Sequence, residues 1–224
     1  MCGRYSLGVS PARIAEVFEL SDEPEFQPRY NIAPTQDAPV ILALPEGRRL
    51  ELRRWGFVPF WAKDPKIGSR MINARAESVG EKPAFRNAFR RQRCLVPADG
   101  FYEWKPAGLH KQPFHVRRSD AWPFGMAGLF DVWHAGQPDE IASFTILTTD
   151  ANGLLRPIHE RMPLILDGRS CSAWLDPATP LARLHELLAP PDPAGFEAYP
   201  VATLVNRPAV DDARCREPIR DTMG

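Results

Sequence analysis

The first residues of the chain, Met1-Cys2-Gly3-Arg4, carry its most distinctive chemistry. Because Cys2 is small, we expect the initiator methionine to be removed, which would leave one residue with both a free α-amine and a thiol. In model compounds the amine titrates near ~7.7–8.0 and the thiol near ~8.5, so roughly a tenth of the amine is unprotonated at neutral pH and able to attack a carbonyl. With an aldehyde the amine forms a Schiff base, and the thiol then closes a five-membered thiazolidine ring. The alternative is a cysteine that lies at the terminus by chance.

Glu103 and His159, both far from the N-terminus in sequence, could supply general acid–base catalysis. Glu103 lies between Tyr102 and Trp104, and a carboxylate among aromatic rings loses hydration, which raises its pKa toward neutrality. His159 lies in a proline-flanked stretch that predicts a constrained loop, and its unperturbed pKa near ~6.5 suits a proton shuttle. Each residue has a structural alternative: Glu103 could face solvent on a strand, and His159 could be a hydrogen-bonding loop residue.

Four more polar residues complete the set of candidates. Asn73 could orient a partner group or stabilise an oxyanion, or it could belong to a turn. Arg4, Arg75 and Arg161 could hold phosphates, or they could balance carboxylates of the chain. The carboxylates concerned are Glu77 and Glu160.

The net charge of zero hides an uneven distribution along the chain. Residues 48–118 hold 17 Lys and Arg against 6 Asp and Glu, and the remainder holds 11 basic against 22 acidic residues. Arg, which outnumbers Lys 23 to 5, binds phosphate bidentately and stacks on bases. This concentration of basic residues in one segment predicts a surface that binds a polyanion.

Aromatic residues lie inside this basic segment, at Trp55, Phe57, Phe60 and Trp61. Exposed aromatic rings supply stacking platforms worth roughly 1–3 kcal/mol per base without sequence preference. A wedge such as Trp61 would favour single strands or a junction over continuous duplex. Some of these rings must belong to the core instead, and we expect at least Trp55 or Phe57 to be buried.

The four cysteines, at positions 2, 94, 171 and 215, have no metal-site spacing, since no pair is Cys-x-x-Cys and no His lies at ligand distance in sequence. We therefore expect no metal and no cofactor. In a reducing compartment Cys94, Cys171 and Cys215 are typical of small buried hydrophobic residues.

The elements that must position these residues are short, because 24 prolines interrupt the chain. Three helices are expected: one opened by Ser10-Pro11, one over about 83–93 with its arginines outward, and one from Thr179-Pro180 through Leu188. Strands are expected at 40–44, 50–55, 94–97, 113–118, 123–129, 141–148, 162–166 and 201–205. Strands dominate without β-α-β alternation, which predicts a single α+β domain with a mainly antiparallel, barrel-like β core and flanking helices.

The bulk composition fits that prediction. A chain of 224 residues with 44% hydrophobic and 25% charged residues can form one substantial core. No stretch approaches the ~18 apolar residues of a membrane span, and no signal peptide is visible. We expect a cytoplasmic protein, nucleoid-associated if bacterial, that is a monomer and has no membrane partner.

Taken together, six motifs resemble the SRAP (SOS-response-associated peptidase) family of abasic site processing proteins. They begin with the terminal Met-Cys-Gly-Arg and include Glu103 and His159. The motifs, in chain order, are residues 1–4, 29–34, 54–59, 72–77, 100–104 and 158–163. The resemblance covers residues 2–207, and we expect residues 208–224 to form a partly disordered C-terminal tail.

The resemblance implies capture of abasic sites in single-stranded DNA, whose deoxyribose opens to an aldehyde. The Cys2 amine would attack C1′ of the sugar, Glu103 would assist ring opening and proton transfer, and the Cys2 thiol would close the thiazolidine. His159 would shuttle protons and assist reversal, while Asn73 would position the terminus or the sugar. Arg4 would hold a flanking phosphate. Strand cleavage by β-elimination, an abasic-site lyase reaction, would be a side activity.

Further DNA contacts follow from the same resemblance and from the basic segment. Arg75 would hold a flanking phosphate together with Arg4, and Arg161 belongs to the same candidate set. Trp61 and Trp55 are the candidate stacking residues.

Two other functions use the same residues. A thiol peptidase, perhaps self-processing, would use Cys2 as nucleophile, His159 as base and Glu103 or Asn73 as the orienting group. A non-catalytic binder of single-stranded nucleic acid would bind intact and abasic strands equally and reversibly, with strong salt dependence.

Overall fold

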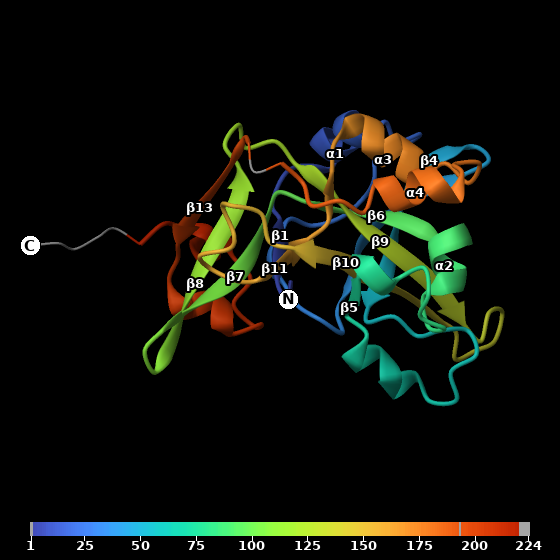
Figure 1. Cartoon of the computed structure of the whole chain (residues 1–224), viewed down its shortest axis with the longest axis horizontal. Coiled ribbons are helices and arrows are strands. Elements are labelled where there is room, and N and C mark those ends of the chain that lie inside the picture. Colours follow the sequence, from blue (N-terminus) through green and yellow to red (C-terminus); the bar gives the residue numbers. More distant parts are fainter. Residues whose placement is uncertain (1, 193, 220–224) are drawn as a thin grey trace, which may run out of the picture.

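Two β-sheets make up most of the part of the chain that the computed structural model describes, residues 2–192 and 194–219. The first sheet has five strands, all neighbours antiparallel. Their order across the sheet is β13 (Phe196–Pro200), β8 (His110–Arg118), β7 (Gly100–Ala107), β1 (Tyr5–Leu7) and β2 (Arg29–Ile32). The hairpin of β7 and β8 extends from the body of the molecule (Figure 1).

The second sheet closes on itself into a barrel. Its strands run in the order β11 (Arg161–Pro163), β10 (Ile141–Asp150), β4 (Gly47–Trp55), β3 (Asp37–Leu44), β6 (Arg93–Ala98), β9 (Phe124–Trp133) and β12 (Ile165–Leu166). Because β9 also pairs with β10, the five strands β10, β4, β3, β6 and β9 form a ring. The short strand β5 (Asn73–Arg75) lies parallel to β10. The predicted α+β class with a mainly antiparallel, barrel-like core is confirmed.

Short helices flank the sheets. They are α1 (Pro11–Phe18), α2 (Arg86–Arg91), α3 (Gly168–Leu175) and α4 (Leu181–Glu186), with 3-10 turns η1 (Pro65–Arg70), η2 (Ala76–Ser78), η3 (Thr203–Asn206) and η4 (Ala213–Arg216). The Ser10 hydroxyl caps α1 as predicted, since it accepts from the backbone N–H of Arg13. Helices α1 and α3 cover the same end of the barrel (Figure 1). None of the described helices is long and apolar enough to cross a bilayer.

Several expectations about elements were wrong. Residues 201–205 do not form a strand: pairing ends at Val201, and the chain turns into η3. Helix α2 spans Arg86–Arg91 rather than 83–93, and Arg93 is buried at the start of β6 instead of facing outward. Its guanidinium donates to backbone carbonyls, including that of Trp174 at 2.7 Å, which satisfies the charge without solvent. The strand expected at 162–166 is divided into β11 and β12, and helix α3 and the strands β1, β2, β5 and β7 were not expected.

The segment after Pro208 is packed as far as it is described. Cys215 is buried in η4, and Val201 forms an antiparallel bridge with Pro218. The expected disorder therefore does not hold for residues 208–219, and residues 220–224 lie outside the described part. Cys94, Cys171 and Cys215 are all buried, as predicted for small hydrophobic side chains.

Candidate active site

Cys2 is brought to Glu103 by the pairing of β1 with β7. Tyr5 lies opposite Phe101, Ser6 lies opposite Gly100, and the backbone N–H of Tyr102 donates to the carbonyl of Arg4 at 3.0 Å. In an antiparallel pair each step toward the N-terminus on one strand is a step forward on the other. Residues 2 and 3 therefore run alongside the segment that carries Glu103.

Asn73 reaches Cys2 from the barrel. Strand β5 holds Asn73 opposite Ile146 of β10, and the side-chain Nδ2 donates to the backbone carbonyl of Cys2 at 2.8 Å. The other amide atom, Oδ1, is buried without a hydrogen-bond partner among the described residues. The candidate site thus lies where the two sheets meet, between β1, β5 and β7 (Figure 1).

Glu103 is almost fully buried, with 1% of its surface exposed. Burial disfavours the ionised carboxylate and raises its pKa to about 7. A carboxyl group with that pKa exists in both protonation states near neutrality, so it can donate a proton in one step and accept one in another. The expected rise in the pKa of Glu103 agrees with this environment, but the cause differs from the prediction: adjacent side chains of a strand point to opposite faces, and Tyr102 and Trp104 pack in a separate cluster.

The Cys2 side chain is fully buried in the main hydrophobic core cluster. Burial raises the pKa of its thiol well above the usual value, and the charge of Glu103 raises it further. The sulfur is therefore a neutral thiol in this structure and needs a base before it can act as a nucleophile.

His159 lies in the connection between β10 and β11, as the predicted constrained loop. Its Nδ1 lies 2.9 Å from the backbone N of Arg161, a contact that fits a neutral ring with its proton on Nε2, and 3.2 Å from the backbone carbonyl oxygen of the same residue, to which the other tautomer would donate. Burial lowers the pKa of the ring, which also favours the neutral form. A neutral imidazole at physiological pH can accept a proton.

Arg75 and Arg161 differ sharply in their surroundings. Arg75 is exposed, two residues beyond Asn73 on β5. Arg161 is held by the protein: its guanidinium contacts Glu77 at 2.8 Å and Asp150 at 2.6 Å, and donates to the carbonyl of Thr148 at 2.6 Å. The alternative of charge balance is thus observed for Arg161, with Asp150 as the second partner instead of Glu160. A phosphate would have to compete with both carboxylates.

The aromatic candidates also separate into two groups. Trp55 is fully buried, its indole N–H donates to the carbonyl of Ile72 at 2.8 Å, and its ring packs on Tyr5 and Phe144. The prediction of Trp55 as a stacking residue is therefore wrong, because no face of the ring is open to a base. Trp61 is 50% exposed and its neighbour Phe60 57%, so these two rings are available.

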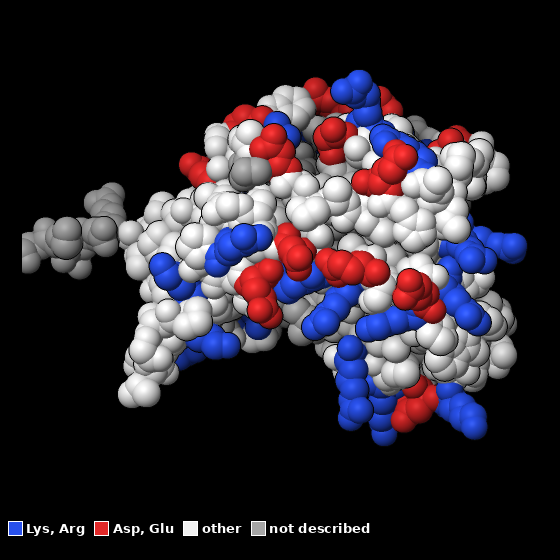
Figure 2. Space-filling model, in the orientation of Figure 1, with Lys and Arg blue, Asp and Glu red and all other residues white. Residues whose placement is uncertain are grey.

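The side chains of the basic segment, residues 48–118, do not form one continuous positive surface. Arg53 and Arg93 are buried, while Figure 2 shows other Lys and Arg side chains along the lower part of the visible face. Acidic side chains lie between them, and the face is hollowed below the centre, between the hairpin of β7 and β8 and the part of the molecule that holds η1. Within residues 2–192 and 194–219 no group of three or more His, Cys, Asp or Glu could hold a metal ion.

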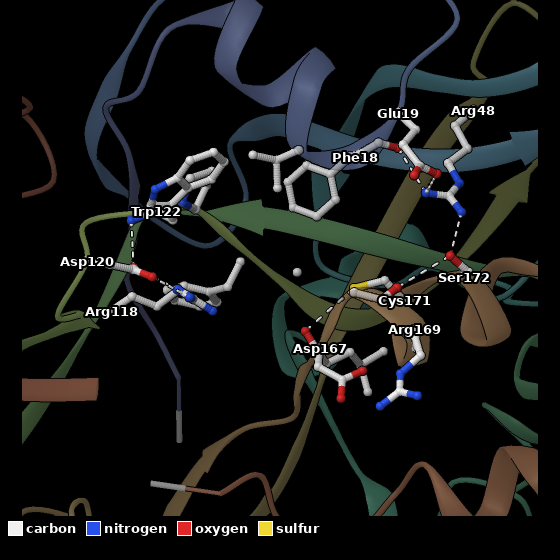
Figure 3. A pocket seen from close by; sticks show the side chains of 16 residues that line it. Phe18, Glu19, Arg48, Arg118, Asp120, Trp122, Asp167, Arg169, Cys171 and Ser172 are labelled. Carbon is white, nitrogen blue, oxygen red and sulfur yellow. Dashed lines mark hydrogen bonds and ion pairs between the residues drawn. The ribbon is translucent and has the colours of Figure 1, made fainter. Parts of the chain in front are cut away.

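A cavity of about 640 Å³ lies elsewhere, between α1, α3 and the start of β9. Figure 3 shows Phe18 and Cys171 in its wall and charged residues around it. Arg48 pairs with Glu19 and donates to Ser172, and Arg118 pairs with Asp120. Its lining includes none of the candidate catalytic residues.

No role was predicted for Asn31, although it belongs to one of the six motifs. It is fully buried on β2, and its Oδ1 accepts from the Arg4 guanidinium at 2.8 Å. Arg4 also donates to the carbonyl of Val205 at 2.7 Å. A polar amide flanked by apolar residues in a strand is the signal that could have indicated it.

Comparison with known proteins gives a consistent result. The family model "SOS response associated peptidase (SRAP)" matches residues 1–208. The "Abasic site processing protein YoqW" of Bacillus subtilis (strain 168) is 42% identical over 213 residues, which cover 93% of this chain and 95% of that protein. The "Abasic site processing protein HMCES" of Xenopus tropicalis is 30% identical, over 96% of this chain and 77% of that protein. A crystal structure of a protein from Bacteroides thetaiotaomicron superposes with a TM-score of 0.87 at 27% identity, covering 98% of this chain and all of that one.

Proposed function

The chain belongs to the SRAP family, and we propose that it processes abasic sites in single-stranded DNA by forming a thiazolidine crosslink through Cys2. One observation carries the proposal: Asn73 binds the backbone of Cys2 at 2.8 Å beside a buried carboxylic acid, Glu103, whose pKa is about 7. An N-terminal aminothiol, a positioning amide and an acid–base group are the parts that this chemistry needs.

The proposed reaction begins after Met1 is removed. The amine nitrogen of Cys2 adds to C1′ of the open-chain sugar, and the resulting carbinolamine loses water to give an imine. The thiol sulfur then adds to C1′ and its proton goes to Glu103, while the ring nitrogen keeps the proton that the imine carries in its protonated, iminium form. The net change is one new C–N bond, one new C–S bond and one molecule of water released.

Glu103 serves both halves of this sequence. In its protonated form it donates a proton to the departing hydroxyl of the carbinolamine, and the carboxylate that remains takes the proton of the thiol. A base is required there because burial and the charge of Glu103 keep the Cys2 sulfur protonated. Asn73 holds the Cys2 carbonyl, and its buried Oδ1 can accept a hydrogen bond from the amine or the sugar.

His159 is the second proton carrier. As a neutral imidazole it can take a proton from the sugar during ring opening and return it when the crosslink reverses. The imine also acidifies the C2′ protons of the sugar, so β-elimination and strand cleavage compete with ring closure. Closure by sulfur protects the strand from this lyase reaction.

The DNA would follow the hollowed face beside the site. Arg75 and the half-buried Arg4 would hold phosphates on either side of the sugar, while Trp61 would stack on a neighbouring base. Phosphate contacts make such binding steeply salt-dependent. Single-stranded DNA is the fitting partner, because an abasic sugar must leave the helical stack to reach a site between two sheets.

The raised pKa of Cys2 argues against a peptidase that depends on a thiolate. Reactive thiol nucleophiles lie in environments that lower the pKa of the thiol, whereas burial and Glu103 raise it here. Removal of Met1 is work that an ordinary aminopeptidase can do.

The test uses protein in which an intact-mass measurement has verified the loss of Met1. Incubation with a single-stranded oligonucleotide that contains one abasic site should give an adduct that survives denaturing electrophoresis. Cys2→Ala should abolish it. Cys2→Ser keeps the amine but cannot close a thiazolidine, so it should leave a labile imine and more strand cleavage.

Three outcomes would contradict the proposal. An undiminished adduct from Cys2→Ala would exclude Cys2 as the attachment point. Equal stability of the Cys2→Ser and wild-type adducts would exclude ring closure. Equal, reversible binding of intact and abasic strands without any adduct would favour a non-covalent binder.

A further inference from the structure

Asn31 organises a buried hydrogen-bond cluster that no step of the proposed reaction uses. Its Nδ2 lies 3.2, 3.0 and 2.7 Å from three backbone carbonyl oxygens of the C-terminal segment, and its Oδ1 accepts from Arg4 at 2.8 Å. The three carbonyls belong to Val205, Arg207 and Val210. Every polar atom of this fully buried side chain is thus engaged.

The C-terminal segment also holds the strand that carries Asn31. The Asp211 carboxylate accepts from the backbone N–H of Asn31 at 2.8 Å and from that of Tyr30, and it pairs with Arg29. Cys215 packs with Tyr102, the residue before Glu103, in a small apolar cluster. The match to the family model ends at residue 208, so this segment, residues 203–216, extends past it.

Arg4 connects the cluster to the N-terminal residues. Its side chain donates to Asn31 and to the carbonyl of Val205, and its backbone carbonyl accepts from Tyr102 at 3.0 Å. The guanidinium is partly buried, which lowers its pKa, so it depends on these acceptors. Both the backbone and the side chain of Arg4, two residues from Cys2, are therefore fixed.

Such ties matter because chain ends fray unless something holds them. Strand β1 is only three residues long, so its own pairing anchors residues 2–4 weakly. A misplacement of about 1 Å can slow a reaction between positioned groups by about a hundredfold. The amine and the thiol of Cys2 must both reach one sugar carbon.

We propose that Asn31 is a positioning residue that acts through Arg4. Residues 203–216 hold Asn31, Asn31 holds the Arg4 side chain, and Arg4 in turn sets the position of Cys2 in the site. The inference rests on the proposed crosslinking function. It assigns the Nη1 atom of Arg4 to internal hydrogen bonds rather than to a phosphate contact.

The test is a double-mutant cycle of Asn31→Ala and Arg4→Met in protein that lacks Met1. Each single variant should crosslink about tenfold more slowly at saturating abasic DNA. The double variant should be no slower than the slower single variant, because both changes remove one shared interaction. Affinity for the intact strand and its salt dependence should stay unchanged for Asn31→Ala.

Arg93→Met is the matched control. Arg93 is also a buried arginine that donates to backbone carbonyls, those of Trp174 and Asp176 at 2.7 Å each, but it lies beside α3. This variant should unfold at a lower temperature and still crosslink at the wild-type rate where it is folded. A slowed reaction in Arg93→Met would mean that general destabilisation explains the Asn31 result.

A second measurement needs no DNA. Amide hydrogen exchange of residues 3–7 should be faster in Asn31→Ala than in wild type, and unchanged in Arg93→Met. If the wild type forms no adduct, the proposed function fails while this experiment still tests the positioning role. Unchanged exchange, or rate losses that simply add in the double variant, would overturn the inference.

Discussion

The side-chain amide of Asn73 donates a hydrogen bond to the backbone carbonyl of Cys2 at 2.8 Å, joining residues that are 71 positions apart. Asn73 belongs to the barrel through β5 and β10, whereas Cys2 leads into β1 of the five-stranded sheet. The bond therefore connects the N-terminal residues, which lead into the five-stranded sheet, to the barrel. Loss of this bond should misplace the aminothiol without removing any part of it.

Asn73→Ala should slow crosslinking by about 10–100-fold, because the reacting groups lose a positioning contact. Affinity for an intact single strand should not change, since the amide is directed at Cys2. Asn73→Asp should be slower still, because a carboxylate cannot donate to the carbonyl and its charge raises the pKa of Glu103 further. A time course of adduct formation measures both. Wild-type rates in Asn73→Ala would exclude the positioning role.

The pH dependence of stability tests the environment of Glu103. Its pKa rises from an unfolded value near ~4.3 to about 7 in the folded chain, so the native state holds the proton more tightly. The stability that this proton confers is present below about pH 4 and is lost as pH rises toward 7. Between pH 4 and pH 7 the titration of Glu103 should lower the free energy of unfolding by up to about 4 kcal/mol.

Glu103→Gln should abolish this loss of stability between pH 4 and pH 7, because the amide does not titrate. The variant should gain stability relative to wild type at pH 8 and should crosslink poorly at every pH. Urea unfolding at pH 5 and pH 8 measures the difference. If the free energy of unfolding changed equally between pH 5 and pH 8 in wild type and Glu103→Gln, Glu103 would titrate at its ordinary pKa.

The positions of Cys2, Asn73 and Glu103 agree better with the sequence-based predictions than those of the candidate DNA contacts. Cys2 is recognisable from its chemistry, which is a local signal, whereas the burial of Glu103 depends on which face of β7 its side chain occupies. The proximity of Asn73 to Cys2 depends on the pairing of β5 with β10 and of β1 with β7. Pairing between strands so far apart in sequence cannot be predicted from one amino-acid sequence alone, and only the resemblance to a family indicated it.

Side-chain direction explains most of the wrong expectations. Trp55 and Trp61 have similar sequence surroundings, yet one ends a barrel strand and points into the core, while the other lies in an exposed turn. The role of Arg161 was equally hidden, because its partner Asp150 is set by the pairing of β10 with β11. The strand expected at 201–205 had β-branched residues, but its hydrogen bonds go to a 3-10 turn.

Trp61 and Trp55 should respond to substitution in opposite ways. Trp61→Ala should weaken binding to an intact single strand by about 1–3 kcal/mol, the range for one base–aromatic stack, and leave thermal unfolding unchanged. Trp55→Ala should destabilise the fold by about 3–5 kcal/mol, because it opens a cavity in the barrel. Fluorescence anisotropy and thermal denaturation separate the two. Full affinity in Trp61→Ala would place the DNA elsewhere on the surface.

Arg75 and Arg161 form the last pair, and salt dependence distinguishes them. Arg75 is exposed beside Asn73, so Arg75→Ala should remove one phosphate contact and reduce the slope of log affinity against log salt by about 1. Arg161 has only 12% of its side chain exposed and is held by Glu77 and Asp150. Arg161→Ala should keep the wild-type slope.

The cost of Arg161→Ala should appear in stability instead. Its loss leaves Glu77 and Asp150 without their shared partner and the Thr148 carbonyl without a donor, a change worth about 1–3 kcal/mol in the free energy of unfolding. Arg75→Ala, which removes an exposed side chain, should unfold like the wild type. Binding isotherms at several salt concentrations, together with urea unfolding, measure both effects. A reduced salt slope in Arg161→Ala would mean that DNA displaces its carboxylate partners, and Arg161 would return to the phosphate-binding set.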